Sequence, residues 1–126
     1  MTYDPECDTI LVVEDEALLR EVTADLFEDA GYRVVTAENA DGAVHFLRGH
    51  DKINVDFTDV NMPGSMNGAQ LAQYVARRWL KIGIVIVSGR PLVHAIPPGA
   101  CFRPKPIDSA EVLHAVEQLA ARSRLS

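Results

Sequence analysis

Five polar or charged residues stand at the ends of short apolar stretches, where they could act together on a phosphoryl group. They are Glu14, Asp15, Asp59, Ser88 and Lys105. Carboxylates that crowd within a few ångströms repel one another, so they persist together only with a bound cation or with some carboxyl groups protonated. Carboxylate and carbonyl oxygens suit Mg²⁺, which keeps several waters and bridges to a phosphate. The cluster therefore predicts magnesium and phosphate chemistry.

The chemical type of each residue suggests its role in such a reaction. Asp59, the most central carboxylate, could attack phosphorus as a nucleophile and form an acyl phosphate. Glu14 and Asp15 would hold the metal. Lys105 would help the metal to neutralise charge on the transferred oxygens, and Ser88 would hydrogen-bond one of them. Catalysis of this kind is mostly positioning and charge.

A parallel sheet is the structure that would bring these residues together. Apolar runs predict strands over residues 9–13, 33–37, 53–58, 82–87 and 100–103, and helical spacing predicts helices over about 16–30, 39–49, 68–80 and from 108 onward. Such β-α alternation indicates an α/β fold with right-handed crossovers. Sites form at the carboxyl edge of such a sheet, where loops and helix N-termini converge.

The first and last helices carry apolar stripes that should face the core. In the first helix the expected inward residues are Leu19, Val22, Leu26 and Ala30, flanked by Leu18 and Phe27. The last helix begins with a capping box of Asp108 and Glu111. Its expected inward residues are Val112, Ala115, Val116 and Leu119.

The alternation fails after the fourth strand, where a fourth helix is due. Residues 90–99 contain three prolines and a glycine, and the two internal prolines remove donors that a helix needs. We therefore predict a loop or a single turn there, so that the fourth helix is shortened or absent.

Composition limits the possible functions. The 126 residues suffice for one domain, with residues 1–8 predicted to be a disordered lead-in and residues 9–126 the folded domain. The net charge is −6 and no stretch concentrates Lys and Arg, so we expect no direct nucleic-acid ligand. No apolar run reaches the ~20 residues of a membrane span, and the two cysteines have no metal-ligand spacing. We expect a cytoplasmic protein without membrane contact.

Four motifs, taken in order, resemble those of a two-component response regulator receiver domain. They are Ile10-Leu11-Val12-Val13-Glu14-Asp15-Glu16, Asp59-Val60-Asn61-Met62-Pro63-Gly64, Val87-Ser88-Gly89 and Lys105-Pro106. Each is weak alone, but together they form a strong signal that covers residues 9 to about 122. The resemblance implies a doubly wound, flavodoxin-like fold whose five-stranded parallel sheet has the order 2-1-3-4-5.

The resemblance also implies roles for individual residues. Asp59 would accept a phosphoryl group from a sensor histidine kinase or a phosphotransfer protein. Glu14, Asp15, Asp59 and the main-chain carbonyl of Asn61 would bind Mg²⁺ as the cofactor. Ser88 and Lys105 would contact the phosphoryl group, and Phe102 would be an aromatic switch that turns inward when Ser88 shifts. The Lys105-Pro106 bond would be cis, as is common in the family.

Some features depart from the family pattern. Lys105 follows Ser88 by only 17 positions, fewer than receivers usually have, and Ser65 looks inserted in the loop after Gly64. Shortening of this region resembles stand-alone receivers of α-proteobacterial type. Because the chain ends soon after the last helix, we expect it to act through an unknown downstream protein or as a phosphate sink.

Two alternatives stay open beside a phosphoryl-accepting module. A phosphatase with an Asp nucleophile commonly needs a second acid two residues later, where this chain has Asn61. A receiver-like interaction module that works without phosphorylation usually lacks the acceptor or the lysine, and both are present here. We therefore expect no enzyme beyond one that catalyses its own phosphoryl transfer and autodephosphorylation.

Asp56 provides a contrast within the strand that carries Asp59. It lies three residues earlier, so it should project from the opposite face of the sheet. We interpret it as structural or solvated. Phe102 could equally be plain core packing.

Overall fold

The computed structural model describes residues 7–49 and 52–125, so residues 1–6 of the predicted lead-in at residues 1–8 lie outside this range. The described chain alternates strands and helices until the fourth strand. In order, the elements are β1 (Thr9–Val13), α1 (Ala17–Asp29), β2 (Arg33–Ala37), α2 (Ala40–Gly49), β3 (Val55–Asp59), α3 (Gly68–Arg78), β4 (Gly83–Ser88), β5 (Cys101–Pro104) and α4 (Ser109–Leu125).

The five strands form one parallel sheet in the order β2-β1-β3-β4-β5. This is the expected fold, and the first two strands have the predicted limits. The other three begin one or two residues later than predicted and end one residue later. As a result Asp59 and Ser88 are the last residues of β3 and β4 rather than the first residues beyond them.

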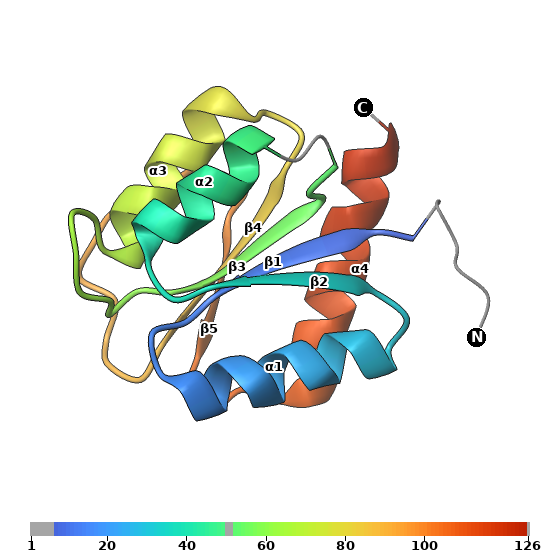
Figure 1. Ribbon diagram of the computed structural model, residues 1–126, viewed down its shortest axis with the longest axis horizontal. Coiled ribbons are helices and arrows are strands. Elements are labelled where there is room, and N and C mark those ends of the chain that lie inside the picture. The colour runs from blue at the N-terminus through green and yellow to red at the C-terminus, as the bar shows by residue number, and fades with distance from the viewer. Residues whose placement is uncertain (1–6, 50–51, 126) are drawn as a thin grey trace.

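Helices α2 and α3 cover one face of the sheet, and α1 and α4 cover the other (Figure 1). On one face α2 and α3 enclose a core that includes Leu11, Ile84 and Leu71. On the other, α1 and α4 enclose a second core, in which the Phe27 ring meets the Phe57 ring edge-on at 5.2 Å between centroids. All four predicted inward residues of the last helix are buried. One of the two hydrogen bonds of the predicted capping box is present, since the Glu111 amide donates to Asp108 Oδ1 at 3.1 Å.

The predicted inward stripe of the first helix was wrong in part. Leu18, Leu19 and Val22 are 66%, 38% and 56% exposed, and Ala30 is exposed as well. Phe27 is buried and Leu26 packs against the core, as predicted, and the helix also buries Ala24. Arg20 takes the inward position near the end of β1, because its guanidinium donates to the Glu14 carbonyl at 2.9 Å. The apolar residues of the first turns therefore remain at the surface.

Residues 89–100 contain no helix, as predicted from their prolines. Instead, Leu92 and Ile96 pack against the core of α2 and α3, and Pro97 is buried. The chain thus covers this part of the sheet with irregular backbone and three apolar anchors. The Lys105–Pro106 peptide that follows β5 is cis, as expected.

Candidate functional site

The sheet topology brings the five sequence-predicted residues to one edge. Glu14 follows β1 directly, Asp59 ends β3, Ser88 ends β4, and Lys105 follows β5. The ladder between β3 and β4 places Asp59 beside Val87, and the Lys105 amide donates to the Ser88 carbonyl at 2.8 Å. The carboxyl ends of β1, β3, β4 and β5 therefore form a single polar site.

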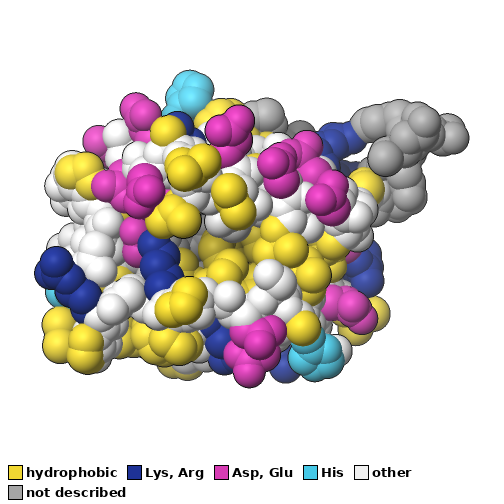
Figure 2. All heavy atoms as spheres, turned by 90° about the horizontal axis from the view of Figure 1, so that it is seen from below, with side chains coloured by type: hydrophobic (Ala, Val, Ile, Leu, Met, Phe, Trp, Pro, Cys, Tyr) yellow, Lys and Arg dark blue, Asp and Glu magenta, His cyan; other side chains and the backbone are white. Residues whose placement is uncertain are grey.

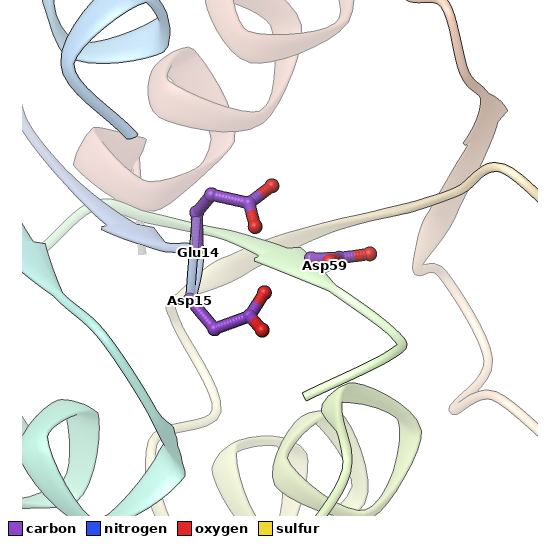
Figure 3. A group of neighbouring side chains, drawn as sticks. All are labelled: Glu14, Asp15 and Asp59. Carbon is purple, nitrogen blue, oxygen red and sulfur yellow. The ribbon is translucent and has the colours of Figure 1, made fainter. Parts of the chain in front are cut away.

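Three carboxylates lie together at the centre of this edge. Glu14, Asp15 and Asp59 each place one oxygen within 4.8 Å of the others. They come from the ends of β1 and β3 and project to the same side (Figure 3). Glu14 and Asp59 are buried, whereas Asp15 is exposed. The pKa of Asp15 is raised, first by partial burial and then by the hydrogen bond and the negative charge of Glu14.

Lys105 holds two of these carboxylates. Its Nζ lies 3.0 Å from Glu14 Oε1 and 3.4 Å from Asp59 Oδ2. Burial alone would lower the pKa of Lys105, but the Glu14 hydrogen bond and the charges of both carboxylates outweigh it, so the pKa is raised. The lysine is therefore charged at neutral pH and points at Asp59 Oδ2.

Hydrogen bonds position the remaining polar groups around Asp59. The Asn61 amide donates to Asp59 Oδ1 at 3.3 Å, and the Asn61 side chain donates to Ser88 Oγ at 3.3 Å. Ser88 Oγ also accepts from the Arg90 amide at 3.1 Å. The loops after β3 and β4 are thus tied together through Ser88, which is itself buried.

The start of α3 packs closely against the end of β3 at Gly68. A Cβ on this residue would lie 2.0 Å from the Asp59 carbonyl oxygen, so only glycine fits there. The Gly68 amide donates to the Val60 carbonyl at 2.8 Å, and Asn67 with Gln70 forms a reciprocal capping box. The positive end of α3 is therefore fixed beside the carboxylate edge.

The residues of the site fit a hard divalent cation. Three carboxylates offer oxygens within coordinating reach of one another, and oxygen ligands are what Mg²⁺ prefers. The exposed Asp15 leaves one side open to water, which Mg²⁺ retains when it binds. Asn61 lies next to this group, through its amide contact with Asp59. Glu14, Asp15, Asp59 and the Asn61 carbonyl remain the predicted ligand set.

Phe102 lies away from the carboxylates, in β5. Its side chain is partly buried and packs against the core of α2 and α3. Its carbonyl accepts a 2.9 Å bond from the Arg103 guanidinium. The position is compatible with core packing, and its role as a switch stays a prediction.

Asp56 projects from the opposite face to Asp59, as predicted, but it is not solvated. It is fully buried, and its register partners are Leu11 and Ile84 in the core of α2 and α3. Thr58 Oγ1 donates to Asp56 Oδ1 at 2.6 Å, while Oδ2 has no hydrogen-bond partner among the described residues. Burial raises the pKa of Asp56 to about 7. Nothing in the alternation of the strand could separate a buried carboxyl from a solvated one.

The sequence did not predict an apolar hollow that lies next to the site. A cavity of about 360 Å³ opens between α1 and α4, with Asp59 and Lys105 at one end and Leu19, Val22 and Ile107 along its walls. Figure 2 shows this hollow on the face of α1 and α4, with acidic side chains along one rim. Its walls include the residues of the first helix that had been assigned to the core.

Comparison with known proteins gives consistent results. The family of response regulator receiver domains matches residues 10–117. The nitrogen assimilation regulatory protein NtrX of Azorhizobium caulinodans is 31% identical over 122 residues, which cover 92% of this chain and 27% of that protein. FixJ, a transcriptional regulatory protein of the same species, is 32% identical over 94% of this chain and 58% of its own length. The chain thus spans about a quarter of one relative and little more than half of the other.

A solved structure shares the whole fold. The response regulator receiver protein from Sinorhizobium medicae WSM419 superimposes with a TM-score of 0.85, at 27% identity over 95% of this chain and 99% of that chain. Within the described residues, none of the helices has the length and apolar character required to cross a membrane.

Proposed function

The chain belongs to the response regulator receiver family, and from this premise we propose that it accepts a phosphoryl group on Asp59 in a Mg²⁺-dependent reaction, with a histidine kinase or a phosphotransfer protein as donor. Receiver domains in general are phosphorylated by histidine kinases and bind Mg²⁺ at an acidic pocket. In this scheme the protein is a cytoplasmic signalling module. It is not an enzyme beyond its own phosphoryl transfer and autodephosphorylation.

One observation carries the proposal: a lysine and two further carboxylates lie around the carboxylate of Asp59. Asp59 Oδ2 lies 3.4 Å from Lys105 Nζ, and the oxygens of Glu14 and Asp15 lie within 4.8 Å of Asp59. A lone structural carboxylate needs neither the second charge of Glu14 nor the exposed Asp15. An acceptor that must stabilise a transferred phosphoryl group needs both, together with a cation.

The reaction forms one bond and breaks one. An oxygen of Asp59 attacks phosphorus while the bond between phosphorus and the donor imidazole nitrogen breaks, and that nitrogen keeps the electron pair. Bound Mg²⁺ supplies positive charge for the phosphoryl oxygens. Lys105, which is already charged, supplies a second cation. The Ser88 hydroxyl accepts a hydrogen bond from the Asn61 side chain, and once that bond is released the hydroxyl can donate to a phosphoryl oxygen. The inward turn of Phe102 would then read out this movement.

The apolar hollow supports a protein as the phosphodonor. Leu18 and Val22 lie exposed on α1, and Leu19 and Val22 line the hollow that ends at Asp59 and Lys105. A helix of a donor protein that covers this apolar surface would bring its phosphohistidine to the carboxylates. We define Leu18, Leu19 and Val22 as the α1 patch.

Val22→Arg is expected to separate protein donors from small ones. A charged side chain in the α1 patch should slow transfer from a histidine kinase that labels the wild type by about tenfold or more, because the docked helix would have to bury it. Labelling by acetyl phosphate should stay unchanged. Val93→Arg, at an apolar position that is 84% exposed and outside the patch, is the matched control. Equal transfer rates for all three proteins would exclude the patch as the docking surface.

The proposed chemistry is tested by intact mass after incubation with acetyl phosphate. We expect a gain of one phosphoryl group in the presence of Mg²⁺, no gain after chelation of the metal, and loss of the group in hydroxylamine, which cleaves acyl phosphates. A Mg²⁺-independent gain, or one that hydroxylamine leaves in place, would contradict the proposal. Labelling by neither acetyl phosphate nor a kinase would favour an interaction module that works without phosphorylation.

A phosphatase is the weaker of the two hypotheses for the function. Hydrolysis of an acyl phosphate by a dedicated phosphatase needs an acid or base beside the nucleophile. The residue two positions after Asp59 is Asn61, whose side-chain amide donates to Ser88. An amide can neither give nor take a proton in this role. Multiple turnover of a phosphate ester by the purified protein would restore that reading.

A further inference from the structure

A groove at the end of the sheet opposite the phosphorylation site collects positive charge. It has a volume of about 890 Å³, and its walls carry Arg48, Lys52, Arg78 and Lys81 beside Trp79 and Leu80. We call it the basic groove. These four residues are a third of the 12 lysines and arginines of a chain whose net charge is −6. They come from the ends of α2 and α3 and the connections that follow, so they are neighbours in space but lie apart in the sequence.

A single tyrosine holds two of the cations in place. The Arg48 guanidinium donates to the Tyr74 hydroxyl at 2.7 Å, and the Arg78 guanidinium lies over the Tyr74 ring, 4.9 Å from its centroid. Within residues 7–49 and 52–125, neither guanidinium forms an ion pair with a carboxylate. Two like charges oriented on one ring repel each other, and an anion between them would relieve that repulsion.

Helix capping does not account for this arrangement. Basic residues often gather where helices end, and α2, α3 and α4 all end at this side of the sheet (Figure 1). Among the described residues, however, both arginines contact Tyr74 and neither donates to a terminal carbonyl. Three helix ends contribute about half a negative charge each, which is less than the two full positive charges of Arg48 and Arg78. The groove therefore remains attractive to anions.

Apolar surface in the same groove narrows the class of ligand. Leu80 is 87% exposed, and the Trp79 ring packs near Tyr74 at 5.9 Å between centroids. A nucleic acid would bring a long row of phosphates toward a chain that is acidic overall, and acidic side chains line the rim of the α1 face. A short acidic peptide needs only local positive charge and can also place an apolar side chain on Trp79 and Leu80.

We propose that the basic groove binds an acidic segment of a partner protein, with carboxylates on Arg48 and Arg78 and an apolar side chain against Trp79 and Leu80. This interaction is separate from the phosphoryl chemistry at the opposite edge of the sheet. It gives the protein a second surface for protein contacts. This surface does not depend on residues 89–100, the connection between β4 and β5 that contains no helix.

Trp79 makes the proposal directly testable because it is the only tryptophan in the chain. The probe is a synthetic peptide in which glutamates flank a leucine, titrated at low salt while tryptophan fluorescence is recorded. We expect a saturable change that salt weakens. In the Arg48→Ala, Arg78→Ala double variant the affinity should fall by about tenfold or more. Arg77→Ala removes an exposed charge from the same helix outside the groove and is the matched control.

Three results would overturn the proposal. Absence of a saturable change in the wild type would remove the binding site. An equal loss of affinity in Arg77→Ala would mean that only general charge attraction is at work. Tighter binding of a single-stranded oligonucleotide than of the peptide would assign the groove to nucleic acid instead. Because no phosphoryl donor is present in any of these titrations, failure here leaves the proposed function of Asp59 untouched.

Discussion

Asp59→Asn is expected to abolish phosphoryl uptake from acetyl phosphate and from any kinase, while the fold remains intact. An amide oxygen lacks the negative charge that attacks phosphorus, so no acyl phosphate can form. The substitution keeps the size and shape of the side chain. It also leaves an acceptor for the Asn61 amide, which now donates to Asp59 Oδ1. Intact mass after incubation, with circular dichroism as the folding check, measures both parts of the prediction.

Asp56→Asn is the matched control for this experiment. It makes the same chemical change in the same strand, at a side chain that is likewise buried, but on the face away from Lys105 and Glu14. Uptake should therefore persist in Asp56→Asn. If Asp59→Asn still gains the phosphoryl group, or if Asp56→Asn loses it while folded, the acceptor has been misassigned.

Asp56→Asn is also expected to remove a large pH dependence of stability. In the folded protein the pKa of Asp56 is raised from 3.8 to about 7 by burial. Between these two values the unfolded chain releases a proton that the folded chain retains. Raising the pH through this window therefore lowers the free energy of unfolding, by about 4 kcal/mol in total. Below about pH 4 this contribution is fully present, and above about pH 7 its loss is complete.

Urea denaturation at a series of pH values between about 4 and 8 measures this effect. The wild type should lose stability as the pH rises, and the slope should disappear in Asp56→Asn. The new amide donors are buried and cost about 1–3 kcal/mol at every pH, so the slope and not the offset is the diagnostic quantity. Asp25→Asn, an exposed residue on α1, should keep the wild-type slope. Retention of the slope in Asp56→Asn would show that another group titrates.

Local sequence signals were sufficient for most of the fold and for the assembly of the site. Short apolar runs located the five strands, most clearly β1 and β4, which are buried on both faces of the sheet, where a parallel strand tolerates little else. The prolines of residues 90–99 excluded a helix, since they lack the donors that a helix requires. Once the strands were parallel neighbours, Asp59, Glu14 and Lys105 had to meet at one edge.

Features that depend on packing could not be predicted. The stripe of Leu19 and Val22 has helical spacing, yet Arg20 turns toward the sheet because the Glu14 carbonyl binds it. Asp56 looked like an ordinary strand residue, and only its neighbours Leu11 and Ile84 show that it is enclosed. The basic groove brings together residues from position 48 to position 81, which no local count of charges detects.

The contact between Gly68 and the backbone of Asp59 couples the position of α3 to that of the end of β3. The helix starts against the acceptor and spans 11 residues, or about 16 Å of rigid rod, before Arg78 reaches the basic groove. If the end of β3 moves on phosphorylation, α3 would move with it as a rigid body. If this movement changes the affinity of the groove for its peptide, thermodynamic reciprocity requires the bound peptide to shift the phosphorylation equilibrium by the same factor. A binding partner would then be a regulator of the signal as well as its reader.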